Sequence, residues 1–105
     1  AVGYAALKLN QTGSSAVAIG HNALAADVTV EESTAVGTNA LMSQTSGRNN
    51  AFGFRALQDL TNGTYNTAVG GETLENIQGG SYNTAIGAEP LLLGIITFTG
   101  AITQG

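Results

Sequence analysis

One short, mostly apolar phrase recurs along the chain at an almost constant spacing. It consists of Ala, then Val, Ile or Phe, then Gly, two variable residues, a small residue and Leu. From the glycine of one copy to that of the next, the steps are 17, 17, 16, 17 and 17 residues. So regular a period indicates one structural unit stacked on itself, which is a repeat architecture. The copies begin with Ala1-Val2-Gly3, Ala18-Ile19-Gly20, Ala35-Val36-Gly37, Ala51-Phe52-Gly53, Ala68-Val69-Gly70 and Ala85-Ile86-Gly87.

The length of the repeat predicts strands rather than helices. A helical repeat needs about 33 to 47 residues and an apolar period near 3.6. Seventeen residues rich in Gly, Asn, Thr and Ser instead fit short strands joined by tight turns. We therefore expect an all-β fold, a parallel β-roll or β-solenoid of about six coils. Turn signals fall at matching positions in Gly13-Ser14-Ser15, Ser46-Gly47-Arg48, Asn62-Gly63-Thr64 and Gly79-Gly80-Ser81, whereas Glu31-Glu32-Ser33 lacks a glycine there and is expected to turn differently.

Strand alternation divides the repeat into two apolar rows. In the copy around Val69, Ala68 and Gly70 face one way and Val69 faces the other. The Ala and Gly row fits the narrow interior of a coil, so the bulkier row needs a second partner, and a second chain is the simplest candidate. The predicted core ladder joins this bulkier row to the repeat leucines: Val2, Ile19, Val36, Phe52, Val69, Ile86, Leu7, Leu24, Leu41, Leu57, Leu74 and Leu91.

Asparagines and tyrosines also recur in phase with the repeat. Asn49, Asn66 and Asn83 are 17 residues apart, so we expect their side-chain amides to stack as a ladder in the turn region. Tyr65 and Tyr82 share another position and are expected to stack as an aromatic pair. Such a pair either covers a turn or offers a contact surface for a sugar or a protein.

Composition excludes several classes of protein. About 10% of the residues are charged, where about 25% is average, and the chain is too apolar for a disordered segment. A net charge of −4 leaves no basic surface for nucleic acid or anionic lipid. The absence of cysteine removes disulfides and thiolate metal sites. Because Ala1 lies inside a repeat, we expect the chain to derive from a longer precursor.

The sequence gives little support for a catalytic or metal-binding site. His21 is the only histidine, and we expect it at an outer turn position without a partner. Asp27, Glu31 and Glu32 match no calcium-loop spacing. Ser14 could join a catalytic triad only through His21, and no nucleophile-elbow motif occurs. We therefore predict no catalytic residue, no metal, no cofactor and no enzymatic activity.

Two triplets have the form of glycosylation sequons. They are Asn10-Gln11-Thr12 and Asn62-Gly63-Thr64, and both lie in predicted turns. Asn10 and Asn62 are therefore candidate glycosylation sites if the source organism modifies such sites.

The C-terminal segment departs from the pattern. Pro90 takes the place of the small residue, and because proline cannot donate to a β-ladder, we expect the regular roll to end there. Residues 91–105 carry no charge and are too short and too rich in Thr for a membrane-spanning helix, so a strand is predicted. The predicted organisation is a β-roll repeat domain over 1–91, and a segment over 92–105 that caps the roll, docks onto another molecule or continues the fibre.

Some of these phrases resemble a known family of repeats. Asn66-Thr67-Ala68-Val69-Gly70, echoed by Asn83-Thr84-Ala85-Ile86-Gly87 and Ala16-Val17-Ala18-Ile19-Gly20, is similar to the head repeat of trimeric autotransporter adhesins. With Tyr65 before it and Leu74 after it, the phrase is closer still to related repeats of bacteriophage tail fibres and bacterial surface proteins. The resemblance implies a left-handed parallel β-roll, three chains around a common axis and an extracellular place on a cell or virion surface.

The function expected from these observations is structural or adhesive. The chain would be a homotrimeric segment of an extracellular fibre that serves as a rigid spacer or binds a host-surface glycan or protein, without inserting into a membrane. The alternative is a filament subunit that stacks head to tail. An ice-binding solenoid is disfavoured, because Val17 and Asn50 interrupt the column formed by Thr34, Thr67 and Thr84.

Overall fold

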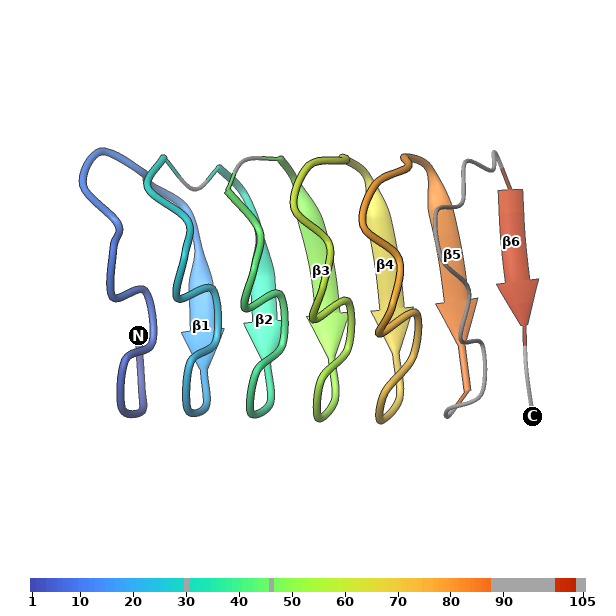
Figure 1. Cartoon of the computed structure of the whole chain (residues 1–105), viewed down its shortest axis with the longest axis horizontal. Helices are drawn as coiled ribbons and strands as arrows, with labels where there is room; N and C mark the ends of the chain where they lie inside the picture. Colours follow the sequence, from blue (N-terminus) through green and yellow to red (C-terminus); the bar gives the residue numbers. More distant parts are fainter. Residues whose placement is uncertain (30, 46, 88–99, 104–105) are drawn as a thin grey trace.

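The computed structural model describes residues 1–29, 31–45, 47–87 and 100–103. It shows an all-β chain in which parallel strands form one sheet, in the order of the sequence (Figure 1). Successive turns of chain stack along the longest dimension, so the molecule is a β-solenoid. Its strands are β1 (Val17–Ile19), β2 (Thr34–Val36), β3 (Asn49–Phe52), β4 (Asn66–Val69), β5 (Asn83–Ile86) and β6 (Gly100–Thr103).

The register of the sheet follows the sequence repeat. Ala18 pairs with Ala35, Ala35 with Ala51, Ala51 with Ala68, and Ala68 with Ala85. An isolated parallel bridge between Val2 and Ile19 adds the first copy of the repeat to the stack. Each copy therefore lies directly on its equivalent in the next coil, which is what the 17-residue period requires.

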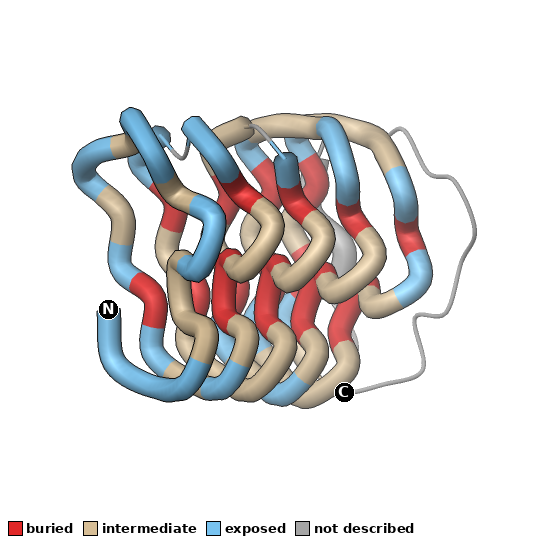
Figure 2. Tube along the Cα trace, turned by 60° about the vertical axis from the view of Figure 1, so that its left-hand side comes forward, coloured by how far each residue is buried: buried red, intermediate tan, exposed pale blue. Residues whose placement is uncertain are grey.

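The core of the chain is a stack of alanines facing a stack of leucines. The strand alanines and the repeat leucines of the middle coils are fully buried (Figure 2). Leu7, in the first coil, is only half-buried, and Leu91 lies outside the described residues. Leu60 and Ile77 are also fully buried, although they were not part of the predicted ladder. The fully buried members of the two stacks are Ala18, Ala35, Ala51, Ala68, Leu24, Leu41, Leu57 and Leu74.

The bulkier row of the predicted ladder is not part of this core. With alanine pointing inward, strand alternation turns its Val, Ile or Phe neighbour to the outer side of the sheet. The inner side of the strands therefore carries the alanines, and the bulkier row lies on the outer side of the sheet, at the surface of the single chain. The exposed members are Val2 (65%), Ile19 (42%), Phe52 (40%), Val69 (37%) and Ile86 (50%), and Val36 is half-buried.

The turns depend on left-handed backbone conformations. The repeat glycines have φ values from 120° to 146°, and Gly47, Gly63 and Gly80 in the opposite turns are also positive. Glu32, in the turn without a glycine, adopts φ 45°. The repeat leucines have φ values of 51° to 53°, an unfavourable conformation for a residue with a side chain.

The last strand of the sheet lies in the C-terminal segment. β6 pairs in parallel with β5, with Asn83 opposite Gly100 and Ala85 opposite Ile102. The strand predicted within 91–105 is therefore confirmed, and it joins the sheet in the same register. Pro90, where the regular roll was expected to end, lies with the rest of 88–99 outside the described residues.

Candidate functional site

The outer face of the sheet carries one continuous apolar stripe. We call it the outer apolar row, and it consists of Val2, Ile19, Val36, Phe52, Val69 and Ile86. Its members repeat at the spacing of neighbouring strands, about 4.8 Å. Beside it runs a second column in which Thr34, Thr67 and Thr84 are half-buried. Contiguous exposed apolar side chains of this kind mark interaction surfaces.

The repeated asparagines form a buried amide ladder. The Asn66 Nδ2 donates to Asn49 Oδ1 at 2.9 Å, and the Asn83 Nδ2 donates to Asn66 Oδ1 at 2.8 Å. The same two oxygens accept the backbone N–H groups of Asn66 and Asn83 at 3.0 Å. All three side chains are fully buried. The ladder therefore joins coil to coil and offers no surface to a ligand.

A buried polar cluster adjoins the ladder, and the sequence analysis missed it. The Gln44 Nε2 donates to Asp27 Oδ2 at 2.6 Å and to Ser33 Oγ at 3.1 Å. The Gln44 Oε1 accepts from Asn49 Nδ2 at 2.7 Å, while Asp27 Oδ1 accepts the Thr29 backbone N–H at 3.1 Å. Burial raises the pKa of Asp27, and these hydrogen bonds only partly oppose that effect. Asp27 and Gln44 occupy the same position of the repeat as Leu60 and Ile77, which are buried in later coils. The change from polar to apolar residues at this position was the sequence signal for the cluster.

Tyr65 and Tyr82 lie together at the turn edge of the solenoid. Their ring centroids are 5.3 Å apart with an interplanar angle of 17°, and both residues are about half exposed. The Arg48 Nη1 donates to the Tyr65 hydroxyl at 3.4 Å, and its guanidinium pairs with Glu31 at 3.1 Å and Glu32 at 3.5 Å. The two stacked rings therefore form one partly exposed aromatic surface at this edge.

His21 has a neighbour that the sequence did not suggest. Its ring stacks on Tyr4 with centroids 5.4 Å apart and an interplanar angle of 23°. The expectation of a partnerless histidine is therefore wrong, because Tyr4 and His21 occupy equivalent positions in successive coils. No group of three side chains able to hold a metal ion occurs among the described residues.

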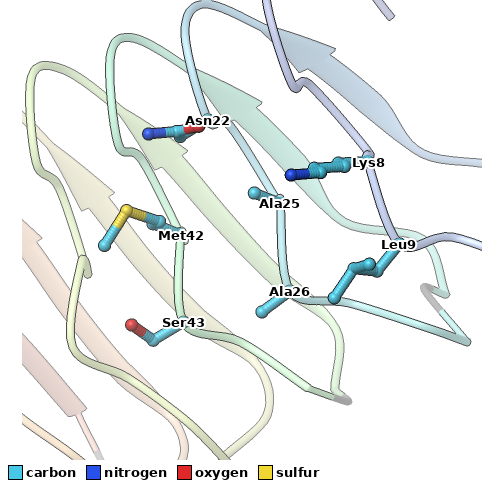
Figure 3. A pocket seen from close by; sticks show the side chains of 7 residues that line it. All are labelled: Lys8, Leu9, Asn22, Ala25, Ala26, Met42 and Ser43. Atoms are coloured by element: carbon cyan, nitrogen blue, oxygen red, sulfur yellow. The ribbon is translucent and has the colours of Figure 1, made fainter.

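An open depression lies on the side of the coils opposite the sheet (Figure 3). It has a volume of about 460 Å³. Ala25 and Ala26 line its middle, between Lys8 and Leu9 of one neighbouring coil and Met42 of the other. The depression collects no set of polar groups suited to catalysis. Its lining residues are Lys8, Leu9, Asn22, Ala25, Ala26, Met42 and Ser43.

The two sequon asparagines differ in accessibility. The half-buried Asn10 uses its side chain locally, since Asn10 Oδ1 accepts the Gly13 backbone N–H at 2.9 Å. Asn62 is exposed. Only Asn62 therefore offers a free side chain to a modifying enzyme.

No family model, curated protein or solved structure matches the chain. In the part of the chain that the structure describes, no helix is long and apolar enough to cross a bilayer. A functional interpretation therefore depends on the surfaces described above and on the resemblance of the repeats.

Proposed function

We propose that the chain is a structural or adhesive segment of an extracellular fibre on a cell or virion surface. In this proposal three copies assemble as a left-handed β-roll trimer and bury their outer apolar rows against one another. Tyr65 and Tyr82 face outward and contact a host-surface glycan or protein. No residue is assigned a catalytic role.

The exposure of the outer apolar row is the observation that carries the proposal. Five of its side chains are between 37% and 65% exposed in the single chain. Complete burial of one such side chain stabilises by about 1.5 to 3 kcal/mol, and symmetry multiplies that gain over every copy. A surface with a row of unburied Val, Ile and Phe side chains thus favours association.

A pair of charge substitutions in the same coil tests this proposal. Val69→Asp places a charge in the interface, where desolvation costs several kcal/mol per ion. Because Val69 is 37% exposed in the single chain, the variant should keep its β-rich circular dichroism but sediment as a single chain. The control Gln78→Asp adds the same charge at an exposed position and should keep the mass of the wild type. Assembly of Val69→Asp at the wild-type mass would remove the outer apolar row from the interface.

The head-to-tail filament stays as the alternative because the coils are nearly identical. Each coil stacks on its equivalent in the next at one register within the chain. Coils of two molecules could stack on one another in the same way. This alternative predicts a mass that rises continuously with concentration, where a closed trimer predicts a constant mass.

A further inference from the structure

The turn between Leu60 and Asn66 contains the only Asn-Gly dipeptide of the chain, Asn62-Gly63. Asn62 is exposed. Among the described residues, no hydrogen bond engages the side chain of Asn62 or the backbone N–H of Gly63. The reacting groups of an intramolecular attack are the side-chain amide carbon and the following backbone nitrogen. They are adjacent in the chain, and no hydrogen bond among the described residues holds either group.

We propose that Asn62 is a site of spontaneous deamidation, a covalent modification that needs only water. The Gly63 backbone nitrogen loses its proton and bonds to Asn62 Cγ, while the side-chain nitrogen takes up a proton and leaves as ammonia. Water then opens the resulting succinimide ring at one carbonyl to give aspartate, or at the other to give isoaspartate. The net change exchanges ammonia for water, and no oxidant or reductant takes part.

The conformation of the turn requires glycine at position 63. Glycine leaves the attacking nitrogen unhindered, and Gly63 is held at φ 148°. A Cβ at this position would meet the carbonyl oxygen of Gly80 in the next coil. A bulkier residue that would slow the attack is therefore excluded by the stacking of the coils.

The buried asparagines provide an internal contrast. Asn49, Asn66 and Asn83 are fully buried, and their amides are hydrogen-bonded in the ladder. None of them precedes a glycine. The chemistry is thus confined to Asn62 among these four residues.

The two products should affect the solenoid differently. Either one adds a negative charge, which takes the formal net charge from −4 to −5. Isoaspartate also routes the main chain through the side-chain carbon and lengthens the turn by one atom. Since Gly63 O accepts from Asn49 Nδ2 at 2.9 Å, that lengthening displaces an acceptor of the amide ladder, whereas aspartate leaves the backbone path unchanged.

Mass spectrometry of the aged protein tests the proposal independently of the assembly state. The intact chain is incubated in mildly alkaline buffer, digested and compared with a free peptide spanning residues 59–66. We expect the fragment with Asn62 to gain about 1 Da, to separate into two isomers, and to accept methyl groups from an isoaspartyl methyltransferase. The fragments containing the ladder asparagines should keep their mass.

Two variants separate the effects of charge and backbone. Asn62→Ser should abolish the mass gain, and Asn62→Asp should match the charge of the products while keeping the melting temperature of the fresh protein. The isoaspartate fraction of the aged protein should melt at a lower temperature than both. An unchanged Asn62 fragment, after the free peptide has been fully converted, would overturn the proposal.

Discussion

Side chains at equivalent positions of successive coils can hydrogen-bond to one another, and the asparagines are the clearest case. The amide oxygens of Asn49 and Asn66 each accept two N–H groups of the next coil at 2.8 to 3.0 Å. The sequence predicted this stack, because an in-phase repeat brings identical residues together. It did not reveal the cluster of Asp27 and Gln44, because there the partners are different residues.

Shortening the central ladder residue should be costly. Asn66→Ala removes the acceptor of the Asn83 backbone and side-chain N–H groups and leaves them buried without it. A buried unsatisfied group costs about 1 to 3 kcal/mol, so we expect a loss of about 3 kcal/mol in the free energy of unfolding, measured by urea denaturation. The exposed control Asn76→Ala should change it by less than about 0.5 kcal/mol. Equal stability of the two variants would contradict the structural role of the ladder.

Asp27 should make the stability depend on pH. Burial raises its pKa in the folded chain above the ordinary value of 3.8, so the folded state binds its proton more tightly than the unfolded state does. The contribution of Asp27 is therefore most favourable at low pH and decreases as the pH rises from about 3.8 through the folded-state pKa. Thermal melts across this range should show that decline in the wild type and a flatter curve for Asp27→Asn. Parallel curves would show that the carboxyl group is not desolvated as described.

At the scale of the elements, the turns are the part that sequence rules predict least completely. Glycines at chain reversals were expected, but leucines at φ of 51° to 53° were not. The left-handed conformation costs a residue about 1 to 2 kcal/mol, which argues against leucine. Burial of the same side chain returns about 1.5 to 3 kcal/mol, so packing outweighs the local preference once the coils are stacked.

Two glycine substitutions distinguish required from replaceable turn positions. Gly20 has φ 126°, and a Cβ there would lie 2.7 Å from the Gly37 carbonyl oxygen. Gly20→Ala should therefore destabilise the chain by at least about 2 kcal/mol in the free energy of unfolding. Gly71 has open space around its Cα, so Gly71→Ala should be neutral or stabilise by up to about 1 kcal/mol. Similar urea midpoints for the two variants would contradict the described turn geometry.

For the whole molecule, the repeat determines the architecture and leaves the assembly open. The constant period was enough to predict a parallel solenoid, because each coil contacts only its neighbours. A strand was predicted within 91–105, but its register on β5 was not, because residues 92–105 do not repeat the phrase that marks the other coils. The period does not determine how many chains assemble. Among the described residues, the outer apolar row is the feature that indicates association.

The mass of the assembled protein in solution therefore tests the proposed trimer directly. Sedimentation equilibrium of the wild-type chain should give three times the chain mass of 10.5 kDa, independent of concentration over the range measured. A mass that grows steadily with concentration would contradict the closed trimer and favour the filament. A folded single chain at every concentration would contradict association through the outer apolar row, because this row would then be stable in water without a partner.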